Sequence, residues 1–158
     1  KPRFEKKAER ELRLKGFEVY LPLEKRLKQW SDRKKWVLEP VIRSYIFVRV
    51  NRVELENAYR TPGILTIVRF EGEPAPIQDK QIELIKTLLS SEESFEVTSD
   101  AFEIGAFVEV VHGNMKGFKG ELVEHLNRYK VLIRLEVVQQ NLLININPSY
   151  IKKVEQTV

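Results

Sequence analysis

The sequence predicts an α+β protein in two parts: an N-terminal antiparallel sheet with flanking helices, then a small five-stranded β-barrel. Three observations lead to this prediction. Helix-like and strand-like hydrophobic spacings alternate over residues 1–89. Residues 90–101 are polar, rich in Ser and Glu and without periodicity, which is typical of a linker. Short, closely spaced strand patterns follow over 102–158, as in a small barrel.

The first expected elements are a helix and a strand. Apolar residues recur every four positions over residues 3–15, which predicts an amphipathic helix, and Gly16 is suited to end it. A strand is expected next over 17–23, where Pro22 indicates a sheet edge or a bulge.

A basic hairpin is expected to follow. Residues 24–36 are rich in Lys and Arg and contain both tryptophans, and Ser31-Asp32 has turn chemistry. The returning strand is expected over 41–50. It carries apolar residues on both faces, which indicates that it is buried on both or presents one face to a partner.

Three shorter elements complete the first part. The pattern predicts a short helix over 53–60, a strand over 64–70, and a helix that Asp79 caps. The sequence begins at Lys1 rather than Met, and we expect a further strand to precede it. With that strand the order becomes βαββαβα, an α+β sandwich.

The second part alternates apolar and polar residues with the period of two that strands show. Dense Val, Ile and Leu favour strands over helices here. Glycines in a helix would each cost about 1 kcal/mol relative to alanine, which further favours a stable barrel. The expected strands cover residues 106–111, 120–126, 129–137, 140–146 and a short stretch near 150–154.

Composition narrows the class of protein. The 158 residues are 42% hydrophobic and 32% charged and include no cysteine, which excludes disulfides and thiolate metal sites. No apolar run approaches the roughly 18 residues of a membrane span, so a cytoplasmic location is the default expectation. The net charge is +4, but residues 1–36 alone hold 13 Lys/Arg against 6 Asp/Glu. This local excess indicates contact with a polyanion or, equally, a solvated helix face.

The sequence offers no catalytic constellation. His112 and His125 are the two histidines, and neither stands in a metal-binding or catalytic spacing. The glycine loop that begins at Gly113 lacks the Gly-Lys-Ser/Thr ending of a phosphate-binding loop, because Phe118 follows Gly117. We therefore expect no enzymatic activity, no cofactor and no metal.

Residues 105–123 read GAFVEVVHGNMKGFKGELV. This stretch resembles a KOW domain, in which a strand leads into a glycine-rich loop and another glycine begins the next strand. Glycine suits such a place because it permits positive φ and close approach of the backbone. The resemblance implies a KOW motif made of Gly113, Lys116, Gly117 and Gly120.

Two stretches of the first half, residues 61–64 (TPGI) and residues 43–48 (RSYIFV), resemble parts of the N-terminal domain of NusG transcription factors. Residues 61–64 (TPGI) resemble the family's threonine-proline-glycine-valine turn. Residues 43–48 (RSYIFV) resemble its proline-glycine-tyrosine strand, with Arg43-Ser44 in place of the proline-glycine pair. The family's first strand, with its tryptophan-tyrosine pair, would precede Lys1.

Residues 20–22 (YLP) and 30–35 (WSDRKK) look most like the specialised NusG paralogues of Bacteroidetes capsular polysaccharide operons. The resemblance implies a monomeric elongation factor that binds RNA polymerase and acts as a processive antiterminator or anti-pausing regulator. The KOW domain would recruit a ribosomal protein or termination factor. The implied polymerase-binding residues are Ile42, Tyr45, Phe47, Pro62 and Gly63.

The basic hairpin is expected to contact upstream or non-template DNA near the transcription bubble. The expected nucleic-acid-binding residues are Trp30, Arg33, Lys34 and Lys35, which combine phosphate contacts with an aromatic side chain for base stacking. Ordinary solvated charge beside packed indoles is the alternative. For the whole chain the alternative is a KOW-type RNA- or ribosome-binding protein. The near-neutral charge of residues 101–158, with 7 Lys/Arg and 6 Asp/Glu, favours a protein partner for that part.

Overall fold

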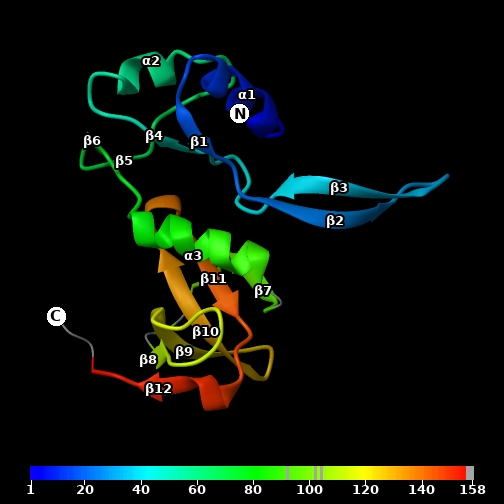
Figure 1. Ribbon diagram of the computed structural model, residues 1–158, viewed down its shortest axis with the longest axis vertical. Coiled ribbons are helices and arrows are strands. Elements are labelled where there is room, and N and C mark those ends of the chain that lie inside the picture. Colours follow the sequence, from blue (N-terminus) through cyan, green and yellow to red (C-terminus); the bar gives the residue numbers. More distant parts are fainter. Residues whose placement is uncertain (92, 102, 104, 156–158) are drawn as a thin grey trace. The chain divides into compact units, whose positions relative to one another are not determined.

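The computed structural model describes every residue except 92, 102, 104 and 156–158 (Figure 1). Its contacts divide the chain into two compact units, Lys1–Ala75 and Pro76–Val158. Each unit is described by itself below.

The first unit mixes short helices with two-stranded antiparallel pairs. The pairs are β1 with β4, β2 with β3, and β5 with β6. Its elements in chain order are α1 (Glu5–Leu14), β1 (Glu18–Tyr20), β2 (Leu23–Gln29), β3 (Lys34–Pro40), β4 (Phe47–Arg49), α2 (Leu55–Tyr59), β5 (Arg69–Phe70) and β6 (Glu73–Pro74).

A small core joins α1, β1 and α2. Leu12, Val19 and Ala58 are buried together, as the helical spacing of α1 predicts. Five partly buried side chains pack against this core: Phe17, Ile46, Val48, Val50 and Ile64. Gly16 follows α1 with φ +86°, the left-handed conformation that ends many helices.

The first unit confirms the helices over 3–15 and 53–60 and the hairpin, but its other strands are shorter than expected. Only Phe47–Arg49 of the expected strand 41–50 pairs, because its partner β1 is itself three residues long. Of the expected strand 64–70, only Arg69–Phe70 pairs with another strand. Hydrophobic spacing indicates which residues are buried. A strand needs, in addition, a neighbouring strand with which its backbone can form hydrogen bonds.

The second unit is a six-stranded antiparallel sheet with one long helix. The strand order is β12-β8-β9-β10-β11-β7, and all five strands expected from the sequence are present. The elements are α3 (Asp79–Ser90), β7 (Phe95–Thr98), β8 (Ala106–Val110), β9 (Lys119–His125), β10 (Arg128–Leu135), β11 (Gln140–Ile144) and β12 (Ile151–Lys153), with 3₁₀ turns at Glu136–Val138 and Pro148–Tyr150.

The structure differs from the expected linker over 90–101. Residues Phe95–Thr98 form β7, which pairs with β11 at the edge of the sheet. The division between compact units falls at Ala75 and Pro76, so α3 belongs to the second unit. The N-cap of α3 is Gln78 rather than Asp79, and Asp79 lies in the first turn, where a carboxylate still favours the positive end of the helix dipole.

Glycines shape the loop between β8 and β9 in two ways. Gly113 and Gly117 have φ of +78° and +89°, which few other residues adopt. Gly120 is required by space: a Cβ there would lie 2.6 Å from the carbonyl oxygen of Leu132 on β10. Lys116 between them is exposed. The close approach expected for Gly120 is therefore confirmed.

Candidate functional site

The hairpin of β2 and β3 projects from the rest of the first unit (Figure 1). Its strands form seven antiparallel residue pairs, from Leu23 with Pro40 to Gln29 with Lys34. At the tip the backbone nitrogen of Trp30 donates to the carbonyl oxygen of Arg33 at 2.8 Å, around Ser31-Asp32. The sequence prediction of a turn there is confirmed.

The register divides the hairpin side chains between two faces, because directly opposed residues in an antiparallel pair lie on the same face. One face, here called the tryptophan face, holds Lys25 opposite Leu38, Leu27 opposite Trp36, and Gln29 opposite Lys34. The other, here called the ion-pair face, holds Glu24 opposite Glu39, Arg26 opposite Val37, and Lys28 opposite Lys35.

The ion-pair face largely neutralises itself. Arg26 donates to Glu24 at 2.7 Å, and Lys28 pairs with Glu39. The hydrogen bond from Lys28 lowers the pKa of the Glu39 carboxyl below its usual value. Both carboxylates of this face therefore have a cation beside them, which leaves Lys35 as the excess charge.

The tryptophan face is apolar and exposed. Leu27, Trp36 and Leu38 are 49%, 57% and 50% exposed. The ammonium of Lys25 lies 5.4 Å from the centroid of the Trp36 ring, within cation–π range. Lys25 and Lys34 supply two positive charges, and none of the six residues of this face is acidic.

The four nucleic-acid-binding residues expected from the sequence do not share one surface. Lys34 and Lys35 are adjacent in β3, so their side chains leave on opposite faces. Trp30 is 55% exposed at the tip, and Arg33 lies 3.9 Å from Asp32. Lys25 is not among the residues expected from the sequence, because its position over Trp36 depends on the register of the two strands.

The expected polymerase-binding residues divide into accessible and covered ones. Tyr45 is partly exposed and Pro62 is exposed. Ile42 and Phe47 retain only 1% and 9% exposure, so their side chains are covered in this structure. Phe47 pairs with Tyr20 across β1 and β4, and the two rings stack with centroids 6.4 Å apart.

Ser44 occupies the position of the glycine in the proline-glycine-tyrosine strand that residues 43–48 resemble. The φ of Ser44 is +67°. That left-handed conformation explains why glycine suits the position. Here the Ser44 backbone nitrogen donates to the buried Glu5 carboxylate at 2.9 Å. This contact ties the segment before Tyr45 to α1 and helps to offset the strain of a non-glycine residue.

The backbone conformation and the surroundings of residue 63 explain why it is a glycine. Its φ is +95°, and a Cβ there would lie 3.4 Å from the Phe4 ring and 3.5 Å from Ala8 on α1. The turn 61–64 therefore lies against α1, and the exposed Pro62 is its accessible residue.

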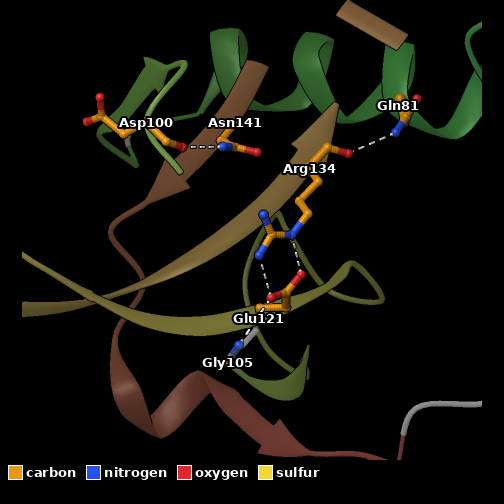
Figure 2. Close-up of polar contacts among 6 residues, drawn as sticks. All are labelled: Gln81, Asp100, Gly105, Glu121, Arg134 and Asn141. Atoms are coloured by element: carbon orange, nitrogen blue, oxygen red, sulfur yellow. Dashed lines mark hydrogen bonds and ion pairs between the residues drawn. The ribbon is translucent and has the colours of Figure 1, made fainter. Parts of the chain in front are cut away.

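A polar network organises the second unit (Figure 2). Glu121 on β9 accepts two hydrogen bonds from the Arg134 guanidinium, at 2.8 and 3.0 Å, and one from the Gly105 backbone nitrogen at 3.2 Å. The Arg134 hydrogen bond lowers the pKa of Glu121, and Glu121 in turn raises the pKa of Arg134.

Two further side-chain hydrogen bonds near this ion pair reach neighbouring segments. The Gln81 side chain on α3 donates to the Arg134 carbonyl oxygen at 3.2 Å, and the Asn141 side chain donates to the Asp100 carbonyl oxygen at 2.9 Å (Figure 2). Each bond links a strand of the sheet to the segment before or after β7. The buried Glu121 carboxylate accepts three hydrogen bonds from within the protein, which is typical of a structural ion pair.

Two negative findings concern the described part of the chain only. It contains no cluster of three or more His, Cys, Asp or Glu residues that could hold a metal ion. Among the helices described there, none has the length and apolar character to cross a membrane.

The family model for NusG, described as transcription termination factor nusG, matches residues 1–86, more than half of the chain. The chain belongs to the NusG family. This is a family of transcription elongation and termination factors whose members bind RNA polymerase. The matched region contains the hairpin, Tyr45 and the turn 61–64, and it ends within α3.

A solved structure of Thermotoga maritima NusG, titled "Domain interaction in Thermotoga maritima NusG", is similar in fold. The TM-score is 0.54 at 20% sequence identity, and the similarity covers 98% of this chain and 93% of that one. No curated protein matches the sequence significantly.

Proposed function

We propose that this NusG-family chain binds RNA polymerase through its first unit and acts as an operon-specific antiterminator or anti-pausing regulator in the cytoplasm. The family match over residues 1–86 is the observation that carries the proposal. Within it, Pro62 is exposed and Tyr45 and Gly63 are partly exposed, whereas Ile42 and Phe47 are buried. The role is one of binding, so no catalytic residue or cofactor is required.

The second unit is proposed to recruit a further partner, a ribosomal protein or a termination factor. Its strands 106–110 and 119–125 and the glycine loop between them fit the KOW pattern. The specialisation toward capsular polysaccharide operons rests on the sequence resemblance of residues 20–22 and 30–35.

Binding of the full chain to core RNA polymerase tests the proposal. Tyr45→Ala should weaken binding by about 2 kcal/mol, as for a central aromatic anchor. Tyr129→Ala is the matched control, because Tyr129 is an exposed tyrosine of the second unit. Amide NMR spectra establish that each variant is folded. Absence of binding by the wild-type chain, or equal affinities of the wild type and folded Tyr45→Ala, would contradict this assignment.

A second assay determines whether the chain suppresses or promotes pausing and termination. Single-round transcription on a template with a pause and a terminator should show shorter pauses and more read-through when the chain is added. Tyr45→Ala should lose both effects in parallel with its affinity. More termination with the wild-type chain would reverse the proposed direction of regulation while leaving polymerase binding intact.

A further inference from the structure

The segment between β3 and β4 contains a backbone conformation that its own residues do not favour. Ser44 has a φ of +67°, in the left-handed region that a residue with a Cβ adopts only at a cost. Tyr45, the next residue, is partly exposed. Backbone strain of this kind persists only where the surrounding structure holds it in place. The conformation of Ser44 therefore requires a contact that stabilises it.

The carboxylate of Glu5 supplies this contact. The Ser44 backbone nitrogen donates to Glu5 Oε1 at 2.9 Å, from a position 39 residues away in the sequence. Glu5 is 9% exposed, so little water competes for the bond. Its place in the first turn of α1 favours a negative charge, because the positive end of the helix dipole lies there. The left-handed residue is thus attached to the end of a helix.

The position of Ser44 explains why its conformation matters for Tyr45. Ile42, two residues earlier, is buried at 1% exposure, and Ile46, two residues later, packs against the core of the first unit. Both ends of this short stretch are therefore fixed by packing. Between them, a change of φ at Ser44 turns the chain in another direction and moves Tyr45 with it.

We propose that Glu5 is the positioning residue of the polymerase-binding site: it holds Ser44 in the left-handed conformation and thereby presents Tyr45 to RNA polymerase. The inference deepens the proposed function and rests on it for the role of Tyr45. Glu5 is buried, so it acts through Ser44 and not by touching the partner. Its effect on affinity arises because a partner binds only the fraction of chains that have the competent conformation.

Backbone NMR chemical shifts of residue 44 in the full chain test the conformational part without polymerase. The wild type and Glu5→Gln should both show a left-handed residue 44, because the amide oxygen of Gln still accepts a hydrogen bond from the Ser44 nitrogen. Glu5→Ala removes the acceptor and should lose this signature. A left-handed residue 44 in folded Glu5→Ala would overturn the proposal.

Affinity for core RNA polymerase tests the functional part. Glu5→Ala should weaken binding about tenfold, since a hydrogen bond to a charged group contributes roughly that factor or more. Glu11→Ala is the matched control: Glu11 pairs with its neighbour Arg10 on α1, so its loss should leave the affinity unchanged within about twofold. Equal losses in the two variants would refute the proposal in favour of a general effect of α1.

A glycine at position 44 distinguishes positioning from general stabilisation. Glycine adopts a positive φ without strain, so in a Ser44→Gly background Glu5→Ala should weaken binding less than about threefold. An undiminished tenfold loss in that background would contradict the positioning role, because the effect of Glu5 would then not depend on the strain of Ser44.

Two further variants test the turn with Glu5 intact, so the test does not depend on the folding of Glu5→Ala. Ser44→Val should lose affinity, because a β-branched residue strongly disfavours the left-handed conformation, whereas Ser44→Asn should retain it, because asparagine tolerates that conformation. Equal affinities of the wild type and folded Ser44→Val would overturn the proposal.

The set of variants separates this inference from the proposed function. Absence of polymerase binding by the wild-type chain would refute the proposed function itself. Full affinity of folded Glu5→Ala, beside weakened binding by Tyr45→Ala, would refute this inference alone.

Discussion

Removal of the Arg134 side chain should reverse the pH dependence of the second unit's stability. Glu121 has only 9% side-chain exposure and is held by the Arg134 guanidinium at 2.8 and 3.0 Å. Arg134→Met leaves this carboxylate without its cation. Loss of one partner of a buried pair costs about 3–5 kcal/mol. We expect about 3 kcal/mol, because Arg134 keeps 28% exposure and some solvent reaches the pair.

The sign follows from the pKa of Glu121 in each protein. In the wild type the folded-state pKa lies below the ordinary 4.5, so the pair stabilises the fold above that pH, and the contribution is lost as pH falls through the folded pKa. In Arg134→Met, burial should raise the folded-state pKa, because only the Gly105 nitrogen still favours the anion. The variant should therefore lose stability as pH rises from 4 toward 7, roughly the range between ordinary and raised carboxyl pKa values.

Urea unfolding followed by NMR signals of β9 and β10 measures the stability of this unit specifically, since both tryptophans lie in the hairpin. Arg134→Met/Glu121→Gln should recover part of the loss at neutral pH, because a neutral amide can still accept from Gly105. Lys119→Met is the control: its 4.0 Å pair with Glu109 in the same sheet is exposed, so the change should stay below about 1 kcal/mol. A stability of Arg134→Met that rises with pH, as in the wild type, would refute the reasoning.

Three further outcomes are expected. Gly120→Ala should destabilise the second unit by about 1–3 kcal/mol in urea unfolding, because the new Cβ would lie 2.6 Å from the Leu132 carbonyl oxygen; a change below 0.5 kcal/mol, roughly the level of a neutral surface substitution, would mean that the strands separate freely. Glu96→Gln should destabilise this unit more than Lys130→Met in the same assay, since it leaves the buried Lys130 ammonium, 5% exposed and 2.8 Å from Glu96, without an anion; the reverse order would contradict this. Replacement of Arg33, Lys34 and Lys35 together by Ala should reduce crosslinking of the polymerase-bound chain to upstream or non-template DNA, with an effect that shrinks as salt rises; an unchanged salt slope would leave these residues as solvated charge.

Strands with strong alternation could be predicted from the sequence, and weakly marked ones could not. The dense Val, Ile and Leu of 129–137 predict β10 well, although Lys130 within it is buried rather than exposed, because Glu96 on β7 compensates its charge. β7 lies within a Ser- and Glu-rich stretch, and the sequence pattern does not predict it. Its signal is only four residues long, with Phe95 and Val97 alternating with polar neighbours, and its stability comes from pairing with β11.

In the hairpin too, features set by neighbouring residues could be predicted from the sequence, and features set by the pairing of two strands could not. Turn chemistry at Ser31-Asp32 predicts where the hairpin reverses. The composition predicts that the tip is basic and aromatic. The face on which each side chain lies depends on the register of two strands, which no local pattern specifies. For the same reason the sequence alone does not separate Lys34 from Lys35, which lie on opposite faces, and does not indicate that Lys25 lies beside Trp36.

The hairpin of β2 and β3 exposes apolar side chains although few interactions stabilise it. Its two strands pair only with each other, and an isolated two-stranded hairpin is marginally stable in water. Cross-strand contacts such as Leu27 with Trp36 stabilise the hairpin by roughly 0.2–1 kcal/mol each. Exposed ion pairs such as those of the ion-pair face add about 0–1 kcal/mol each. Hydrophobic side chains on the tryptophan face therefore bury little area in the free chain. A partner that covers Trp36 would bury this apolar area and stabilise the hairpin as it binds.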